Sequence, residues 1–197
     1  MTFVLKLCIF APMKYIQHYH TPEGFDDLLL CSDDEALEGL WFEGSRDSRC
    51  FVETFQETSL PSVLSETSRW LDIYFSGCQP DFMPAYRIDN LTPFRKLVSD
   101  IMLEIPFGQI VTYGEIAKHI VEMRHGTSLS TRKMSAQAVG GAVGWNPICI
   151  IIPCHRVLGV NGNLTGYGGG MHNKIALLKH EGHDTNQFSI PNQGNLL

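Results

Sequence analysis

The alternation of apolar and polar positions in the first ninety residues is that of short strands followed by one helix. Apolar runs separated by acidic and turn residues predict antiparallel strands over residues 14–20, 28–32 and 36–44. Between residues 61 and 77 the apolar positions recur at helical spacing, with Pro61 near the start and Gly77 just past the end. We therefore expect a small antiparallel sheet with a helix, acting as a scaffold.

Beyond residue 90 the pattern changes, and apolar positions recur at the three- to four-residue spacing of helices. Helices are predicted over residues 92–105, 112–123, 134–144 and 172–182. The first begins with Thr92 as its N-cap and Pro93 at its first position. The second begins with a capping box formed by Thr112 and Glu115, and the last ends at Gly182. The second half is thus expected to be mostly helical.

Two further segments lie between these helices. Residues 148–152, with the sequence ICIII, form an apolar run that predicts a buried strand ending at Pro153. Residues 157–170 are rich in glycine, and Asn161 followed by Gly162 is typical of a hairpin turn.

Breaks in the pattern divide the chain into four parts. We expect an extension at residues 1–12, an α/β scaffold domain at 13–90, a second domain at 91–182 and a flexible polar tail at 183–197. The two domains meet at a linker, residues 78–90, that contains two prolines. The extension is apolar but short, and no small-x-small cleavage site follows it.

Composition limits the class of protein. Of the 197 residues, 44% are hydrophobic, which is enough for a packed core, and no apolar run approaches the ~20 residues of a membrane-spanning helix. The six cysteines are scattered without a C-x-x-C pair, so we expect free thiols in a reducing setting and no metal site. We predict a monomer without a cofactor, located in the cytoplasm of a bacterium or in the nucleus of a eukaryote.

The net charge of −6 conceals an asymmetry between the two halves of the chain. Residues 1–90 carry fifteen acidic and six basic side chains, whereas residues 91–182 carry nine basic and five acidic ones. The second half is therefore suited to a polyanion such as nucleic acid, and the first half would be turned away from it.

The helix predicted over residues 134–144 contains Gly140 and Gly141, each of which costs about 1 kcal/mol relative to alanine. Two short helices joined by a basic loop, the second with a face of small residues, suggest a helix-turn-helix that meets nucleic acid. Tight packing of helices within the domain explains the glycines equally well. At the start of the preceding helix, Tyr113 lies where backbone N–H groups can bind a phosphate.

The candidate chemistry lies in residues 151–159, IIPCHRVLG, where a thiol, an imidazole and a guanidinium follow a proline. A single cysteine is usually a small buried apolar residue. Because adjacent side chains in extended backbone point in opposite directions, we expect His155 to reach Cys154 through a water molecule. A carboxylate must then orient the imidazole, and Glu181 is the best candidate. Arg156 either lowers the pKa of the thiol or anchors the loop through a salt bridge.

At these residues the sequence resembles a known family. The run NPICIIIPCHRV is similar to the active-site signature of the O6-alkylguanine-DNA alkyltransferases, also called methylated-DNA–protein-cysteine methyltransferases. Four further segments resemble blocks of that family in the same order: FRKLVSDIMLEIPFGQIVTYGEIA, SAQAVGGAVGWNP, GNLTGYGGG and LLKHEG. The similarity is strong over residues 92–182 and weak over residues 14–90.

The resemblance implies a fold and an activity. The first domain would be ribonuclease-H-like, with an antiparallel sheet plus a helix, and the second would be mostly α with a winged helix-turn-helix-like module. The protein would transfer an alkyl group from O6 of guanine, and also from O4 of thymine, in double-stranded DNA to Cys154, and so inactivate itself. His155 and Glu181 would form the water-mediated relay, Asn146 would brace the two helices, and Tyr113 would assist base flipping and donate to guanine.

The same resemblance implies the DNA contacts. The second helix of the module would enter the minor groove while the damaged base is flipped out of the duplex. The candidate contact residues are Tyr113, Arg132, Lys133, Gln137, Ala138, Gly140, Gly141, Arg156, Tyr167, Gly168 and Gly169. Tyr167 and the backbone of residues 166–169 would cover the guanine. Gln137 stands where many members have an arginine finger, so we expect intercalation to persist with weaker binding.

Three other functions are alternatives. A non-catalytic binder of alkylated DNA would keep the fold without the transfer, but the cysteine, histidine and glutamate are all present. A regulator of transcription would need a second DNA-binding domain, which is not visible in residues 1–90. A cysteine hydrolase would need repeated turnover, which a base-binding loop and a duplex-binding module do not favour.

Overall fold

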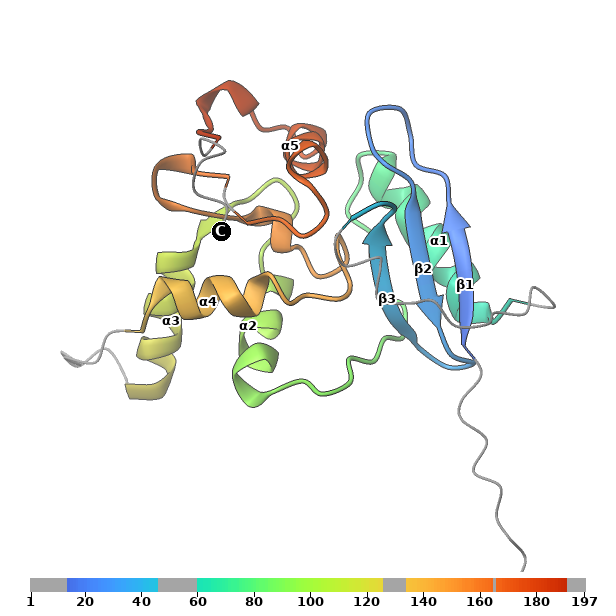
Figure 1. The fold of residues 1–197 in the computed structure, drawn as a ribbon, viewed down its shortest axis with the longest axis horizontal. Helices are drawn as coiled ribbons and strands as arrows, with labels where there is room; N and C mark the ends of the chain where they lie inside the picture. Colours follow the sequence, from blue (N-terminus) through green and yellow to red (C-terminus); the bar gives the residue numbers. More distant parts are fainter. Residues whose placement is uncertain (1–13, 46–59, 126–133, 165, 191–197) are drawn as a thin grey trace, which may run out of the picture.

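Two groups of elements lie side by side in the computed structural model, which describes residues 14–45, 60–125, 134–164 and 166–190 (Figure 1). A three-stranded sheet covered by one helix forms one end of the molecule, and the remaining helices form the other. This arrangement confirms the expected sheet-plus-helix unit followed by a mostly helical one.

The sheet contains β1 (Tyr15–Tyr19), β2 (Leu28–Ser32) and β3 (Leu37–Phe42), paired antiparallel in chain order. Tyr15 lies opposite Ser32, and Leu28 lies between Tyr19 and Phe42 in register. The helix α1 (Ser62–Phe75) packs against β2 and β3. Its buried side chains are Val63, Leu64, Thr67, Trp70, Leu71 and Tyr74, so the predicted apolar stripe is the one that faces the sheet.

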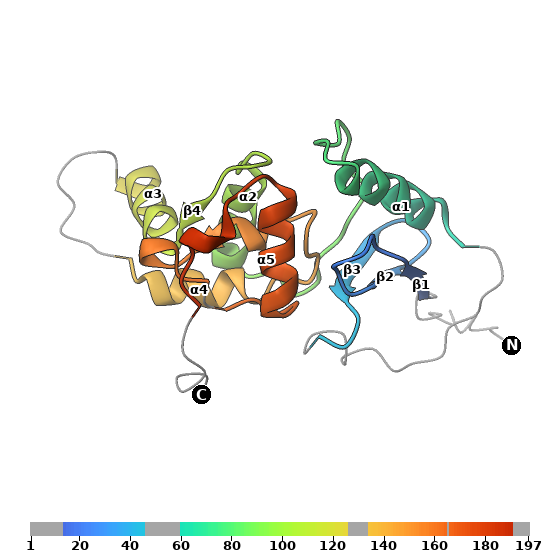
Figure 2. The same ribbon diagram turned by 90° about the horizontal axis from the view of Figure 1, so that it is seen from above.

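The other end of the molecule consists of short elements. In chain order they are α2 (Pro93–Leu103), β4 (Val111–Thr112), α3 (Tyr113–His125), α4 (Ala136–Val143), β5 (Val157–Leu158) and α5 (Met171–His180). The helix α4 packs against both α2 and α3, and β4 pairs with β5 in parallel. Among the described residues, the single-turn 3-10 helices η2, η3 and η4 occupy Cys154–Arg156, Val160–Gly162 and Thr185–Gln187. Seen from above, α5 lies between the sheet and the other helices (Figure 2).

The predicted helix ends are confirmed by their hydrogen bonds. The Thr92 hydroxyl accepts a hydrogen bond from the backbone N–H of Arg95, 3.2 Å away, at the start of α2. Before α3, the Glu115 carboxylate accepts from the Thr112 backbone N–H at 2.6 Å, and the Glu115 N–H donates back to the Thr112 hydroxyl at 3.1 Å. Gly182 follows α5 with a φ of 88°, the left-handed conformation that suits a glycine at a helix end.

The strand predicted over residues 148–152 is wrong. The chain there forms a series of tight turns, in which Ile150 has a φ of 65°. Only its first part pairs with the sheet, because Leu40 bonds to the Pro147 carbonyl at 2.9 Å and to the Cys149 N–H at 3.0 Å. An apolar run indicates burial, but this segment is buried as a turn whose backbone groups are satisfied locally and by a side chain.

The prediction of a flexible tail over residues 183–197 is wrong for its first half. The backbone of Ser189 bonds to Leu164 at 2.9 Å and to Gly162 at 3.1 Å, and Phe188 packs against a small cluster of buried leucines. Backbone hydrogen bonds and one apolar side chain together dock this part of the polar segment. Residues 191–197 lie outside the described residues, as do residues 1–13.

One large cluster of buried apolar residues extends from the sheet into the helical end. It includes Leu40 of β3, Tyr74 of α1, Met102 of α2 and Ile152 beside Cys154. The segment that carries Cys154 is therefore packed against both groups of elements. In the described part of the chain, no helix combines the length and the apolar character that crossing a bilayer requires.

Candidate active site

Cys154 lines a small cavity between the sheet and the helical end. The cavity has a volume of about 20 Å³, room for about one water molecule or a group of similar size. Trp41, Phe42 and Ser45 line it from β3 and the turn that follows, and Tyr167 lines it from the glycine-rich loop. Cys154 itself is 8% exposed. The thiol thus faces a space of the size of a small alkyl group.

His155 and Glu181 form a buried pair. The Nε2 atom of His155 lies 2.7 Å from Oε1 of Glu181, and both side chains are fully buried. In the described part of the chain, the Nδ1 atom of His155 is buried without a hydrogen-bond partner. If Nε2 carries the proton that bonds to Glu181, Nδ1 is left as an acceptor. Burial lowers the pKa of His155, although Glu181 acts to raise it. The net lowering favours the neutral imidazole.

The Glu181 carboxylate is held by several donors. Arg156 donates from Nε at 2.9 Å to one oxygen and from a terminal nitrogen at 2.9 Å to the other. The Tyr74 hydroxyl donates at 2.8 Å, and the Gly108 backbone N–H donates at 3.1 Å. Burial alone would raise the pKa of Glu181, but His155 and Arg156 lower it well below the usual range. The carboxylate is therefore ionised and fixed in orientation.

The assignment of Arg156 to the DNA contacts needs correction. Its guanidinium is buried, and besides Glu181 it donates to the Ile105 carbonyl at 2.6 Å. A side chain whose donors are used inside the core cannot reach a phosphate at the surface. The other reading of the sequence, an anchor that acts through a salt bridge, agrees with these contacts. The premise of an extended backbone at Cys154 and His155 is also wrong, because both lie in a 3-10 turn.

Two buried polar residues near this pair were missed by the sequence analysis. Tyr74 comes from α1 of the scaffold, and no local signal in residues 61–77 distinguishes it from a core tyrosine. Lys174 of α5 is fully buried and donates from Nζ to the Val157 carbonyl at 2.8 Å. Burial lowers its pKa to about 8, although Cys154 acts to raise it. A lysine on the apolar face of a predicted helix was the available signal for this residue.

Asn146 ties together the turns that precede Cys154. Its amide nitrogen donates to the carbonyl of Ile148 at 3.2 Å and to that of Ile152 at 2.8 Å. Its amide oxygen accepts from the Ile148 N–H at 3.1 Å. One buried side chain thereby satisfies three backbone groups and sets the path of the chain into the 3-10 turn of Cys154.

Replacing Asn146 with alanine is expected to lower the free energy of unfolding by about 2–4 kcal/mol, because buried backbone groups lose their partners. Urea denaturation measures this loss. Asn186→Ala, at an exposed position of η4, is the matched control and should change stability little. A loss of less than ~1 kcal/mol for Asn146→Ala would show that the turns hold without the amide.

A groove of about 930 Å³ adjoins the cavity. The start of α3, the exposed face of α4 and the glycine-rich loop line it, and the predicted residues brought together here are Tyr113, Gln137, Gly140, Gly141, Tyr167 and Gly168. Among the described residues, a Cβ added to Gly141 would have no neighbour within 4 Å, and one added to Gly140 would contact the Tyr113 ring at 3.9 Å. Close packing inside the protein therefore does not account for these two glycines.

The remaining predicted DNA contacts lie partly in the described residues and partly outside them. Ala138 is exposed on α4, and Gly169 lines the small cavity. Burial raises the pKa of Tyr113 to about 12, and the nearby Cys154 adds to the effect, so its hydroxyl keeps its proton and can donate. Arg132 and Lys133 lie outside the described residues.

A buried thiol next to an oriented imidazole–carboxylate pair, at the edge of a groove far larger than the cavity, is typical of a thiol-dependent group-transfer protein with a large substrate. Residues 93–183 match the family model for the 6-O-methylguanine DNA methyltransferase, DNA binding domain. The methylated-DNA–protein-cysteine methyltransferase of Methanosarcina acetivorans is 37% identical over 168 residues, which cover 85% of this chain and 98% of the relative. The chain belongs to the methylated-DNA–protein-cysteine methyltransferase family.

Solved structures agree with this assignment. The crystal structure of Mycobacterium tuberculosis O6-methylguanine methyltransferase has a TM-score of 0.67 and 34% identity, covering 86% of this chain and 93% of that one. The structure of Mycobacterium tuberculosis OGT in complex with DNA has a TM-score of 0.66 and 31% identity, with coverage of 89% and 94%. The similarity thus spans both groups of elements and not only the segment around Cys154.

Proposed function

We propose that this protein repairs DNA by transferring the alkyl group from O6 of an alkylated guanine to Sγ of Cys154. The bond between O6 and the alkyl carbon breaks as the bond between that carbon and sulfur forms. The thiol gives up its proton, and the guanine leaves with its O6 restored. Because the thioether is stable, each molecule acts once. The observation that carries this proposal is the position of Cys154 in a cavity of about 20 Å³ beside a groove of about 930 Å³.

The His155–Glu181 pair activates the thiol in this proposal. Glu181 fixes the imidazole through Nε2, which leaves Nδ1 to accept a proton from Cys154 by way of a water molecule. Arg156 and Tyr74 keep the carboxylate ionised and oriented, so that it stabilises the imidazolium as it forms. The buried amine of Lys174 adds positive charge near the developing thiolate.

The flipped guanine is covered by the glycine-rich loop. Tyr167 and Gly168 line both the groove and the cavity, and Gly169 lines the cavity, which supports their assignment to base binding. Tyr113 lies at the groove and keeps its proton at neutral pH, so it can donate to the leaving guanine. Asn146 shapes the turns before Cys154 and acts on the thiol only through them.

The helices α3 and α4 serve as a winged helix-turn-helix-like module, with α4 entering the minor groove. Support comes from the packing of α3 against α4 and from the open space in front of Gly141. A helix face without side chains lets its backbone approach DNA closely. Ala138 and Gln137 lie on the exposed part of the same helix, and Arg132 and Lys133, which precede it in the sequence, would contact phosphates.

We further propose finer assignments. The scaffold at residues 13–90 is ribonuclease-H-like, the acceptor domain spans residues 91–182, and the protein acts as an intracellular monomer on double-stranded DNA. O4-alkylthymine is a second substrate. The small volume of the cavity beside Cys154 favours methyl over larger alkyl groups.

Replacing Gln137 with arginine is expected to strengthen binding to duplex DNA. Gln137 is exposed in the groove, so an added cation there would contact the phosphate-rich duplex. The slope of log binding constant against log salt concentration should become steeper by about 1, as for one additional neutralised phosphate. Gln79→Arg adds the same charge outside the groove and is the matched control. Equal effects of the two variants would place Gln137 away from the DNA.

The function itself is tested by mass spectrometry. The protein is mixed with a duplex that contains one O6-methylguanine, and digested peptides are searched for a methyl group. One methyl group on Cys154 for each protein molecule, with no second turnover, is the expected result. Tight binding without transfer would instead indicate a non-catalytic lesion binder. Multiple turnovers on ester substrates would indicate a cysteine hydrolase.

A further inference from the structure

Asn173 of α5 is a fully buried polar residue that the proposed reaction does not use. Its amide nitrogen donates to the Gly169 carbonyl at 2.7 Å and to Oδ2 of Asp26 at 2.9 Å. Its amide oxygen accepts from the Asp26 backbone N–H at 3.0 Å. Both N–H donors and the carbonyl of one amide are thereby engaged, and they join the segments of Gly169 and Asp26, the latter 147 positions before Asn173 in the sequence.

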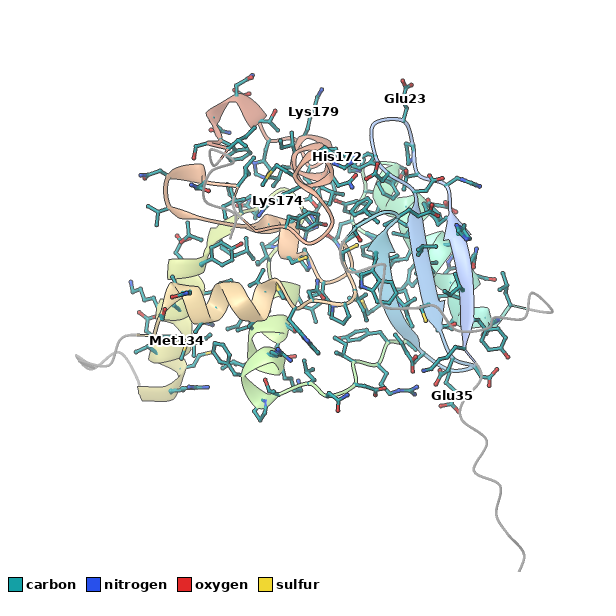
Figure 3. All side chains as sticks on the ribbon, viewed as in Figure 1. Glu23, Glu35, Met134, His172, Lys174 and Lys179 are labelled. Atoms are coloured by element: carbon teal, nitrogen blue, oxygen red, sulfur yellow. The ribbon has the colours of Figure 1, made fainter. Side chains whose placement is uncertain are left out.

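The two segments have different roles. Gly169 belongs to the loop that lines the cavity of Cys154, whereas Asp26 lies in the turn between β1 and β2 of the scaffold. Figure 1 shows this turn next to α5, and Figure 3 labels His172 on the side of α5 toward the turn. The Nε2 atom of His172 lies 2.7 Å from Oδ2 of Asp26, which adds a second contact to the same carboxylate.

The turn is itself held in a defined conformation. The Thr21 hydroxyl donates to the Asp26 carbonyl at 3.1 Å, and the Thr21 backbone N–H donates to Oδ1 of Asp27 at 2.9 Å. His20 contacts Oδ2 of Asp27 at 2.7 Å. A contact made to this turn therefore connects the loop to a preformed part of the scaffold.

A second contact holds the loop against the scaffold. The ring of Phe42, at the end of β3, meets the Tyr167 ring edge-on at a centroid distance of 6.5 Å. A Cβ added to Gly169 would come within 2.8 Å of the Phe42 ring, so the loop backbone lies directly on it. The loop is thus confined on one side by an aromatic ring and tied at its carbonyl by Asn173.

We propose that Asn173 is a positioning residue through which the β1–β2 turn holds the glycine-rich loop ready for the flipped base. This inference rests on the proposed function, in which the loop covers the guanine. A loop with this many glycines has large conformational freedom, and ordering it at the moment of binding weakens affinity. Because Asn173 and Asp26 already hold the loop in the folded protein, the entropic cost of ordering it is met on folding and not on binding.

The test compares Asn173→Ala and Asp26→Ala with the double variant and with Asn186→Ala as control. Transfer from an O6-methylguanine duplex is followed in single turnovers at increasing DNA concentration. The half-saturating concentration should rise by about 10-fold in each variant. The limiting rate constant, and the rate at which iodoacetamide alkylates Cys154, should stay within about 2-fold, because neither depends on holding the base. The half-saturating concentration of the double variant should be no higher than that of the more impaired single variant, because both substitutions break the same connection.

Hydrogen exchange supplies a readout that is independent of transfer. Amides of residues 166–170 should exchange faster in both single variants than in the unaltered protein, while amides of α3 should not change. Unchanged exchange and unchanged half-saturation would overturn the proposal, as would effects that multiply in the double variant. Asp26→Ala, at a partly exposed position, keeps the test valid if Asn173→Ala does not fold. Absence of transfer by the unaltered protein would overturn the proposed function instead, and the exchange result would still decide on the loop.

Discussion

Replacing Cys154 with serine is expected to reduce transfer of the methyl group to the background rate while leaving binding to DNA intact. A hydroxyl remains protonated near neutral pH and is a far weaker nucleophile than a thiolate, even beside the His155–Glu181 pair. The side chain is nearly the same size, so the cavity and the turns around it should persist. Intact-mass measurement after incubation with an O6-methylguanine duplex, together with a binding titration, measures both quantities.

The matched control is Cys78→Ser, which changes an exposed cysteine that does not line the cavity. It should accept one methyl group as the unaltered protein does. Methylation of Cys154→Ser at the rate of the unaltered protein would contradict the proposed mechanism. Methylation of another cysteine in the Cys154→Ser variant would show that the acceptor lies outside the cavity.

Replacing Glu181 with glutamine is expected to lower the free energy of unfolding by about 3–5 kcal/mol and to slow transfer strongly. The change removes the negative charge that pairs with the buried guanidinium of Arg156, and an unpaired buried charge is costly. It also replaces one of the two carboxylate oxygens by an amide N–H2 donor, so the side chain that orients His155 loses its charge and one acceptor. Urea denaturation measures the stability, and single-turnover transfer measures the activity.

Tyr74→Phe provides the graded comparison for this experiment. It removes only one donor to the same carboxylate and leaves both charges in place. A loss of about 1.5–3 kcal/mol is expected, because the hydrogen bond is made to a charged group. If Glu181→Gln were no more destabilising than Tyr74→Phe, the ion pair with Arg156 would contribute nothing beyond hydrogen bonding.

The pH dependence of stability follows from the direction of each pKa shift. The pKa of Glu181 is lower in the folded protein than its ordinary value of about 4.3, so the unfolded chain binds a proton more readily. Its contribution to stability is present above pH ~4.3 and is lost as the pH falls toward the lowered value. The lowered pKa of His155 acts in the same sense below pH ~6.5. Glu181→Gln should show a smaller loss of stability in the acidic range than the unaltered protein.

Local sequence signals were sufficient for most of the elements. The capping residues at Thr92 and Thr112, the Asn161–Gly162 turn and the glycine after α5 each act within four residues of the backbone they affect. Asn161 and Gly162 have φ values of 57° and 69°, so the chain turns tightly there, but the predicted hairpin is wrong, because the described strands do not pair across this turn. Such features can be predicted because their energetics do not depend on distant parts of the chain.

The error over residues 148–152 has a definite physical cause. Five consecutive apolar residues indicate burial, and a buried strand is one way to satisfy their backbone groups. Here the Asn146 amide and tight turns satisfy them instead, which permits Ile150 to adopt a positive φ. The tail at residues 183–190 shows the converse case, in which one phenylalanine and two backbone hydrogen bonds dock a polar segment.

The sequence by itself determined the candidate residues for the chemistry and their local settings. Cys154, His155 and Arg156 are adjacent, and the motif around them indicated both the family and the partner Glu181. The sequence also determined the net positive charge of residues 91–182 and the small residues of α4, because these are properties of single residues and of short periodic segments.

Only the tertiary structure decided how the scaffold takes part in the site. Three contacts join residues far apart in the chain: the Tyr74 hydroxyl donates to Glu181, Phe42 lines the cavity of Cys154, and Asn173 donates to Asp26. The burial of Arg156 and Lys174 was settled in the same way. These contacts depend on how the sheet packs against the helices, and packing geometry arises from the sum of many weak interactions that leave no signature in any short stretch of sequence.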